Sequence, residues 1–527
     1  MGAIKFLNFL LFSFVYTYNG GVGHDVARDG IYDGGRFIYS AGYTLRIHNH
    51  GDTNYDWVIV KIDTSGNEKW KVFYDGGYGD DQSYGIGQRS DGKLVVVGYK
   101  DNNGNKDWRI AVYDTSNGNI IDSLIIGGPG SDYAYSVSIY HDTIFVCGRY
   151  TVTGEGWNWR VLKIDPDLTV VWDSVWHGGN GNDIPYKLMV KNKKIYVSGY
   201  YDSGDPYKNE MKIKVYKRNG EFIRAGEWGD EIERNDDAAN SLCIDDTGNI
   251  YIAGYSALSS GTRRWKIIKF DSTLQNIKWE KVKSPGSSVR SEEARGIKIK
   301  DNYLYVCGYI YNSSTGFDWR IIRYSLTGTD SIIKEIDFNG YNDYAHAICF
   351  YKDKVVVFGS LSNSFDQDFV ITDFTQDLTG YMEFFVKMDV KNEGEFYIVE
   401  LEGKGEFDSI KVFLDGELLD RVYRLPYRVR VKGYEVFAYV FKGREKYKIG
   451  PYYMKKISPA FIASEKGIFY FNPLDISLTL LVFDISGRKV LDFKISPGTR
   501  GKISFTKNGI FILKTDSITL KFFNIRY

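Results

Sequence analysis

Residues 127–139 read Gly-Gly-Pro-Gly-Ser-Asp-Tyr-Ala-Tyr-Ser-Val-Ser-Ile: a glycine cluster, an acid and an alternating apolar run. An acid opens a comparable run at seven places in the chain. These acids are Asp25, Asp81, Asp132, Asp183, Asp237, Glu292 and Asp343. They follow one another at intervals of 51 to 56 residues. A period of this length indicates a repeat architecture with one supersecondary unit per repeat.

Each repeat is predicted to contain four short strands. In the third copy, alternating or β-branched segments occupy residues 133–139, 143–148 and 158–165, and a fourth segment begins at residue 170. Turn residues such as His141-Asp142 separate these segments. No segment has the sustained 3.6-residue apolar period of a helix. The sequence therefore predicts an all-β chain.

Two further residue types recur in register. A glycine ends the second strand of each repeat, at Gly42, Gly98, Gly148, Gly199, Gly254, Gly308 and Gly359. An aromatic opens the third strand, at Trp57, Trp108, Trp159, Trp265, Trp319 and Phe369, with Met211 near this place in the fourth repeat. Seven repeats of four strands predict a seven-bladed β-propeller. We expect the glycines where crowding near the axis leaves little room for a Cβ, and the aromatic ladder between neighbouring blades.

The repeat is similar to a known one. The phrase Gly-Gly-x-Gly-x-Asp-x-Ala, together with Gly-Asn-Ile-Tyr-Ile-Ala-Gly-Tyr at 248–255, resembles the SBBP-type bacterial β-propeller repeat. The resemblance covers residues 20–380. It implies the architecture and a secreted protein, and it implies little about activity, because such propellers are mostly uncharacterised.

The first nineteen residues allow two interpretations. Lys5 followed by the apolar stretch 6–15 is typical of a short secretory signal peptide at residues 1–19. Residues 14–21 also align with 71–77, the last strand of the first repeat, so this segment could instead be a strand that closes the seventh blade. No other segment is long and apolar enough to span a membrane.

The period disappears after residue 380. Residues 382–456 contain strand-like runs around an Asp415-Gly416 turn and resemble the small immunoglobulin-like modules of secreted bacterial proteins. A second β-sandwich is expected at 458–527. Its Asp-Ile-Ser-Gly-Arg-Lys-Val at 484–490 and Gly-Ile-Phe-Ile-Leu-Lys at 509–514 resemble the type A C-terminal sorting domain of the type IX secretion system.

The sorting-domain resemblance has one departure, because Gly509-Ile510-Phe511 replaces the usual Gly-x-Tyr. The resemblance implies export by a diderm bacterium to the extracellular space or outer cell surface, with the secretion machinery as a partner. The alternative is a plain β-sandwich that serves as a spacer.

The seven acids invite a comparison with calcium-binding proteins. Gly-Gly-x-Gly-x-Asp also occurs in RTX β-rolls, but their ligands come from tandem nonapeptides, and the copies here stand about 50 residues apart. The structural interpretation is that each acid accepts backbone N–H bonds at a tight glycine turn. The alternative is that the seven acids form a ring at the channel mouth and hold a calcium ion. No other cofactor is predicted.

Function is constrained mainly by what the chain lacks. The formal net charge is +0, which argues against a nucleic-acid partner. No nucleophile–base, phosphate-loop or metalloprotease motif occurs in the sequence, so no catalytic residue is predicted. The four cysteines stand at equivalent positions of different repeats and are predicted to be buried free thiols.

We therefore predict a non-enzymatic, monomeric binding module for a glycan or a surface protein. Loop aromatics suited to sugar stacking are Trp157, Tyr201 and Tyr207. The alternative is a carbohydrate-active hydrolase or lyase with its site at the channel mouth, for which two converging carboxylates would be the sign.

Overall fold

A computed structural model describes the repeat region from residue 14 to residue 378. Short breaks fall at 21–22, 49–52, 78, 180, 205–208, 230–235, 259, 284–289, 339–340 and 363–366. From residue 385 onward it describes strands and a few turn residues. The hydrophobic core of the predicted signal peptide, in residues 1–13, lies outside the described residues. The chain divides into two compact units between Phe385 and Val386.

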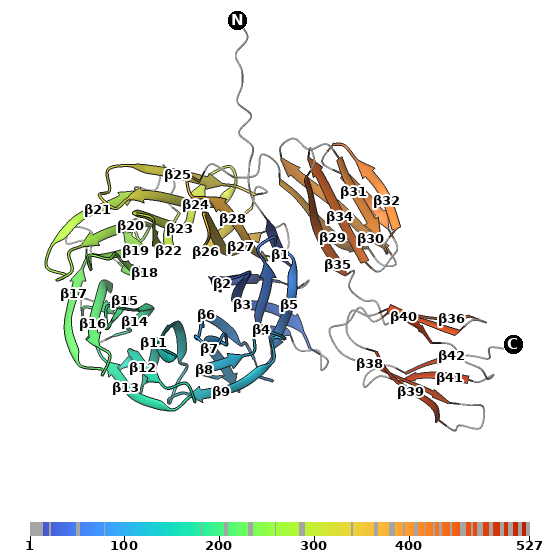
Figure 1. Ribbon diagram of the computed structural model, residues 1–527, viewed down its shortest axis with the longest axis horizontal. Coiled ribbons are helices and arrows are strands. Elements are labelled where there is room, and N and C mark those ends of the chain that lie inside the picture. The colour runs from blue at the N-terminus through green and yellow to red at the C-terminus, as the bar shows by residue number, and fades with distance from the viewer. Residues whose placement is uncertain are drawn as a thin grey trace, which may run out of the picture. The chain divides into compact units, whose positions relative to one another are not determined.

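The first unit is a seven-bladed β-propeller, as predicted (Figure 1). Within the described residues its blades are seven antiparallel sheets of four strands, and no helix occurs. Blade 1 comprises β2 (Asp25–Tyr32), β3 (Phe37–Ile47), β4 (Thr53–Asp63) and β5 (Glu68–Tyr74). Blade 2 comprises β6 (Gln82–Gln88), β7 (Leu94–Asn102), β8 (Asn105–Tyr113) and β9 (Ile120–Ile126). Blade 3 comprises β10 (Tyr133–Tyr140), β11 (Thr143–Val152), β12 (Gly156–Ile164) and β13 (Val170–Trp176).

The remaining blades repeat this order. Blade 4 comprises β14 (Ile184–Lys191), β15 (Lys194–Asp202), β16 (Asn209–Lys217) and β17 (Phe222–Trp228). Blade 5 comprises β18 (Asp237–Ile244), β19 (Ile250–Ala257), β20 (Arg263–Phe270) and β21 (Ile277–Lys283). Blade 6 comprises β22 (Glu293–Lys300), β23 (Tyr303–Asn312), β24 (Gly316–Ser325) and β25 (Ser331–Ile336). Figure 1 shows the first strand of each blade near the axis and the fourth strand at the rim.

The seventh blade is completed by the N-terminal end of the described chain. Its three sequential strands are β26 (Asp343–Tyr351), β27 (Lys354–Ser362) and β28 (Gln367–Thr375). Strand β1 (Val15–Tyr18) adds the fourth, pairing antiparallel with β28 from Val15↔Thr372 to Tyr18↔Phe369. Residues 15–18 therefore act as the closing strand, the second of the two interpretations given above for this segment. This strand gives blade 7 four strands like the other blades and ties the chain just before blade 1 to blade 7.

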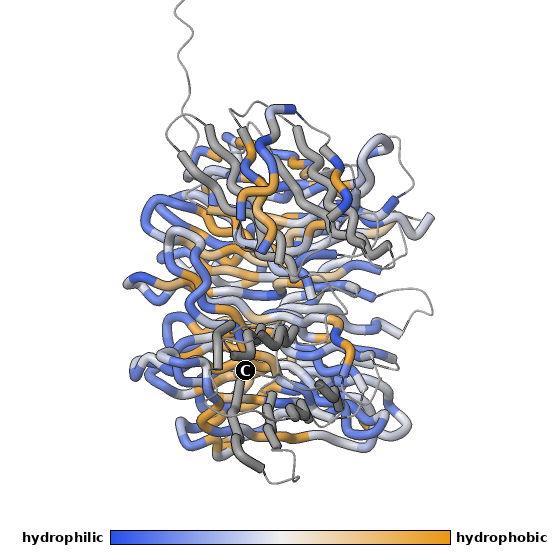
Figure 2. Tube along the Cα trace, turned by 90° about the vertical axis from the view of Figure 1, so that its right-hand side faces the viewer, coloured by the Kyte–Doolittle hydropathy of each residue, from blue (hydrophilic) through white to orange (hydrophobic). Residues whose placement is uncertain are grey.

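The core lies between blades and is built on the aromatic ladder. Trp57, Trp108, Trp159 and Trp319 are 0% exposed, and Trp265 is 1% exposed. The indole of Trp108 donates from Nε1 to the carbonyl oxygen of Arg149 in the next blade at 2.9 Å, and the other four tryptophans make the equivalent bond. Figure 2 shows hydrophobic residues concentrated within strands and hydrophilic ones at the turns. The predicted inter-blade place of the ladder is confirmed.

The second unit consists of two sections with similar sheet composition. Residues 385–453 form a three-stranded and a four-stranded sheet from β29 (Phe385–Glu393), β30 (Phe396–Lys404), β31 (Ser409–Leu414), β32 (Glu417–Val422), β33 (Tyr427–Val431), β34 (Glu435–Lys442) and β35 (Glu445–Tyr453). Residues 460–522 form another such pair of sheets from β36 (Ala460–Ser464), β37 (Gly467–Phe471), β38 (Leu478–Phe483), β39 (Lys489–Ile495), β40 (Arg500–Ile503), β41 (Ile510–Lys514) and β42 (Thr519–Phe522). Leu414 pairs with Glu417 across the predicted Asp415-Gly416 turn. Residues 484–488 and 509, which carry much of the sorting-domain resemblance, lie outside the described residues.

Candidate functional site

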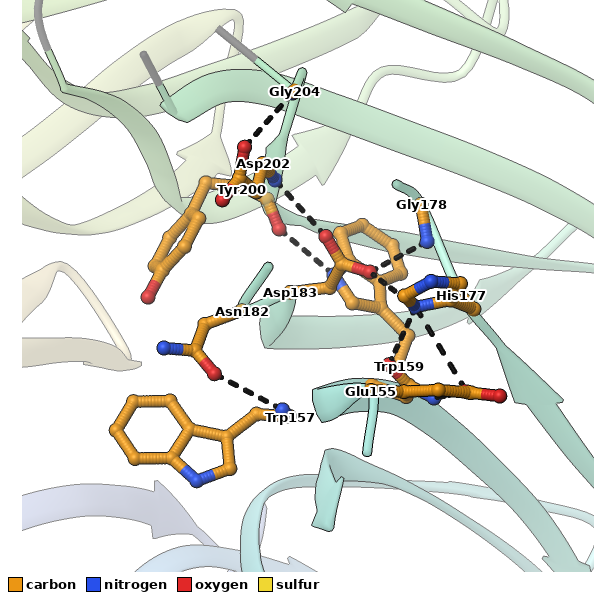
Figure 3. Close-up of polar contacts among 11 residues, drawn as sticks. Glu155, Trp157, Trp159, His177, Gly178, Asn182, Asp183, Tyr200, Asp202 and Gly204 are labelled. Carbon is orange, nitrogen blue, oxygen red and sulfur yellow. Dashed lines mark hydrogen bonds and ion pairs between the residues drawn. The ribbon is translucent and has the colours of Figure 1, made fainter. Parts of the chain in front are cut away.

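The seven acids that define the repeat are buried inside their own blades. Asp25, Asp81, Asp132, Asp183 and Asp343 are 0% exposed, and Asp237 and Glu292 are 3% exposed. Figure 3 shows one of them, Asp183, whose two carboxylate oxygens accept the backbone N–H groups of Gly178 and Asp202 at 2.5 and 2.9 Å. Asp343 likewise accepts from Phe338 and Ser362 at 3.1 and 3.0 Å.

These bonds tie two loops to the start of each inner strand. Apart from the first acid, each accepts a backbone N–H from 19 or 20 residues further along, at the end of the second strand. Burial outweighs these bonds and raises the pKa of Asp81 to about 7 and that of Asp132 to about 6. Among the described residues, no cluster of three metal-ligand side chains includes any of the seven acids. Calcium binding by these residues stays a prediction.

The predicted loop aromatics have different surroundings. Trp157 is half-buried, and the Arg149 guanidinium lies 3.8 Å from its ring centroid. Trp157 also packs against a cluster that includes Tyr200. The half-buried Tyr201 donates its hydroxyl to Glu210 at 3.0 Å and lies under the Lys212 ammonium. Tyr207 lies outside the described residues. The rings of Trp157 and Tyr201 are therefore already engaged by cationic neighbours.

A feature that the sequence did not reveal is a β-bulge in the inner strand of every blade. In β10 the pairing with β11 shifts between Ala134 and Ser136, so that Tyr135 has no partner. A shift over one residue also occurs in β2, β6, β14, β22 and β26. In β18 the shift spans two residues, Ala239 and Asn240. In every blade the residue three positions after the acid is unpaired. A bulge re-aims the side chain of its extra residue.

The bulge supplies the physical reason for the recurring glycine. A Cβ on Gly148 would lie 2.0 Å from the carbonyl oxygen of Tyr133, directly before the bulge. The other six strand-ending glycines meet the equivalent carbonyl at 1.8 to 2.1 Å. The second strand of each blade therefore needs glycine at this position, because a Cβ would collide with a carbonyl oxygen of the inner strand of the same blade. We expected these glycines because of crowding near the propeller axis, and the contact within each blade explains them more directly.

The seven bulge residues form a ring around the central channel. The ring consists of Arg28, Tyr84, Tyr135, Tyr186, Asn240, Arg295 and His346. All seven are half-buried, and all seven line one cavity of about 340 Å³. We call this set the bulge ring. Unlike the acids and the glycines, its members differ from blade to blade.

One side of the bulge ring is aromatic. The rings of Tyr84 and Tyr135 have centroids 5.2 Å apart, and those of Tyr135 and Tyr186 are 5.6 Å apart. These tyrosines come from blades 2, 3 and 4 and make a continuous arc. Burial raises the pKa of Tyr84, Tyr135 and Tyr186 above the usual range, so their hydroxyls stay protonated and can donate hydrogen bonds.

The other side of the bulge ring is cationic. The guanidinium of Arg28 lies 5.2 Å from the Tyr84 ring centroid, and Arg295 forms an ion pair with Glu293 at 2.7 Å. Between these arginines in blade order stands His346. Burial, with Arg28 and Arg295 adding to its effect, lowers the pKa of His346 well below its usual value. The imidazole is therefore neutral at neutral pH.

The carboxylates of the cavity are already neutralised. Its lining contains two acidic side chains, Asp29 and Glu293. Asp29 lies 3.3 Å from the Lys187 ammonium. Although burial opposes the shift, Arg295 and Arg263 lower the pKa of Glu293. A glycosidase needs one carboxyl that is protonated at its working pH, and Glu293 is the opposite of such a group.

A second cavity of about 430 Å³ lies beside the inner strands of blades 4 to 6. Its lining includes Lys191, Lys298 and Lys300, and Lys298 also lines the first cavity. Cys243 borders it, but burial raises the pKa of this thiol. All four cysteines are free and buried, as predicted. No helix in the described part of the chain is long and apolar enough to cross a membrane.

Comparison with known proteins supports the repeat and adds no activity. A family described as "Domain of unknown function (DUF5122) beta-propeller" matches residues 89–120, within blade 2. No curated protein matches the chain. Similar solved structures include the β-propeller domain of the Trilobed protease from Pyrococcus furiosus, at 13% identity and a TM-score of 0.41, covering 71% of this chain and 100% of that one.

Two other similar structures are a WD40 propeller domain and a polysaccharide lyase. The WD40 β-propeller domain of Doa1 has 14% identity and a TM-score of 0.40, covering 69% of this chain and 97% of that one. The polysaccharide lyase Uly1 has 8% identity and a TM-score of 0.44, covering 71% of this chain and 94% of that one.

Proposed function

We propose that the protein is a non-enzymatic glycan-binding propeller whose ligand enters the channel at the bulge ring. One observation carries this proposal. A register shift occurs at this position in all seven blades, while the side chain there is Tyr in three blades, Arg in two, and Asn and His in the remaining two. A position that served only the architecture would repeat one residue, as the buried acids and the opposing glycines do. Side chains that differ on an identical scaffold are typical of a recognition site.

The chemistry of the ring suits a sugar. Pockets for small ligands combine aromatic walls with a few convergent polar groups. Here the tyrosine arc offers flat faces for a pyranose ring and hydroxyls for hydrogen bonds. Asn240 is held in place, because its amide nitrogen donates to the carbonyl oxygen of Ala294 at 2.9 Å. Trp157 belongs to the same aromatic cluster as Tyr135 and Tyr186, which extends the aromatic surface beyond the ring itself.

Location and partners form part of the same proposal. The resemblance of residues 458–527 to a type IX sorting domain and the immunoglobulin-like pattern at 382–456 support export as a monomer to the outer surface of a diderm bacterium. The partner there would be a glycan, with a surface protein as the alternative. Cell fractionation of a strain that expresses the full chain tests this part, and a wholly cytoplasmic chain would refute it.

The binding proposal is tested with a glycan array and a panel of chromogenic glycosides, both applied to the full chain. We expect binding to a subset of glycans and no turnover. The variant Tyr135→Ala should lose that binding, while Tyr423→Ala, at an exposed tyrosine of the second unit, should keep it. Absence of binding to every glycan would refute the proposal. Turnover that disappears in His346→Gln would instead favour a hydrolase or lyase.

A further inference from the structure

We infer that the channel cavity selects a sugar that carries a negative charge, with Arg28, His346 and Arg295 binding the anionic group and the tyrosine arc packing on the sugar ring. This inference rests on the proposed glycan-binding function and specifies its ligand class. The shared chemistry is a carboxylate or a sulfate ester on one sugar residue.

The first argument is the charge of the cavity wall. Five basic side chains line the cavity, against two carboxylates. Lys187 and the pair Arg263 and Arg295 already engage those two carboxylates. Arg28 forms no ion pair with any described residue, and its Nε is buried without a hydrogen-bond partner. An excess of positive charge in a partly enclosed, low-dielectric cavity attracts an anion more strongly than the same charges on an open surface.

The second argument is the placement of the three polar residues. Arg295, His346 and Arg28 occupy the same bulge position in blades 6, 7 and 1, which are neighbours around the channel. Both guanidinium groups are close enough to His346 to add to the lowering of its pKa. Two arginines that line one cavity on either side of His346 offer the forked N–H groups that suit a carboxylate or sulfate. A neutral imidazole between them can donate one further N–H.

The third argument is the aromatic wall. Tyr84, Tyr135 and Tyr186 lie in blades 2 to 4 and line the same cavity as the residues of blades 6, 7 and 1; the two sides meet at Arg28, which lies 5.2 Å from the Tyr84 ring centroid. The planes of neighbouring rings are inclined at 59° to each other, so the arc curves around the cavity. A sugar ring can therefore pack on the tyrosines while its charged substituent points toward the arginines. Neither wall alone would distinguish an acidic sugar from a neutral sugar or from a simple anion.

The fourth argument is size. A cavity of about 340 Å³ is at the lower end of the roughly 300–1,000 Å³ that ligand pockets occupy. It has room for about one sugar residue, so the channel should recognise a chain end or a single side residue. A long polymer threaded through the channel does not fit these dimensions.

Calorimetric titration of the full chain tests this inference with three matched oligosaccharides. One ends in glucuronate, the second is identical but ends in glucose, and the third is the second with one sulfate ester on its terminal sugar. We expect the charged ligands to bind at least about tenfold more tightly than the neutral one, because a charge-assisted hydrogen bond contributes roughly this factor or more. The difference should shrink as sodium chloride is added.

Arg28→Gln should remove most of this preference while leaving the affinity for the neutral ligand unchanged. Arg36→Gln, at an exposed hairpin position, is the matched control and should change neither affinity. Arg28→Lys keeps the charge and should retain part of the preference, which guards against a folding defect in the glutamine variant; melting curves of all variants check this directly. Equal affinity for charged and neutral ligands would overturn the inference and leave the glycan-binding proposal standing. No binding to any of the three would refute both for these sugars.

Discussion

Replacing Trp108 by phenylalanine tests how the blades are held together. The indole is 0% exposed, and its Nε1 donates to the Arg149 carbonyl of the next blade at 2.9 Å. The variant takes a donor from that carbonyl at a site that water does not reach, which costs about 1 to 2 kcal/mol. It also removes two buried ring carbons, at about 0.8 kcal/mol each. We expect the free energy of unfolding to fall by about 3 kcal/mol.

The matched control is Trp70→Phe. The Nε1 of Trp70 also donates to a backbone carbonyl of the next blade, that of Thr115 at 3.0 Å, but this tryptophan is only half-buried. Water can replace the lost donor there, so the cost should stay below about 1 kcal/mol. The two variants make the same chemical change at different burial.

Urea unfolding followed by circular dichroism measures both variants without depending on tryptophan fluorescence. A propeller of about 365 residues has an unfolding entropy of about 0.8 kcal/mol/K, so Trp108→Phe should lower the melting temperature by about 4 °C. Equal costs for Trp108→Phe and Trp70→Phe, or a cost below about 1 kcal/mol at Trp108, would refute the burial argument.

Three further predictions concern pH, the bulge and the thiols. Burial raises the pKa of Asp81 to about 7 and of Asp132 to about 6, so the folded state binds these protons more tightly than the unfolded chain. Their stabilisation should be complete below about pH 4, near the usual carboxyl pKa of the unfolded chain, and be lost progressively as the pH rises from there to about 7, and Asp81→Asn should flatten part of this slope in urea titrations. Gly148→Ala should destabilise the protein by about 2 kcal/mol or more, because its Cβ would meet the Tyr133 carbonyl, while Gly35→Ala at an exposed turn should leave the melting temperature nearly unchanged. A thiol reagent should modify none of the four buried cysteines in the native protein and all four in urea; rapid modification of the native protein would contradict their burial.

The architecture could be predicted from the sequence because its determinants repeat. Asp132, Gly148 and Trp108 each have counterparts in other blades, since an inner-strand turn, a bulge and an inter-blade gap occur in every blade. Met211 could be placed in the ladder only through its register, and it does align with the tryptophans, pairing with Tyr200 as Trp108 pairs with Tyr99. The repeated residues therefore count the blades and set their register.

The candidate site could not be predicted in the same way. The bulge is a backbone feature, and no residue type marks it in the inner strand. Tyr135, Asn240 and His346 share a position but no chemistry, so a search for similarity passes over them. The acids are the more conspicuous candidates for a metal site, because they recur in every repeat. The sequence does hold one indication of the site. The third residue after each acid varies between repeats, whereas the acid and the strand-ending glycine recur.

The bulge also explains why architecture and recognition can be separated in this fold. A bulge residue forms no ladder pair and its side chain lines the channel, so a substitution there leaves the strand pairing of its blade intact. The acid holds the loops and the glycine makes room for the bulge, and neither contributes a side chain to the ring. Because seven such positions face one channel, each ligand contact can change independently on a scaffold that stays constant. The repeated acid is therefore an indirect pointer to the bulge ring, since it lies buried three residues before each side chain that lines the channel.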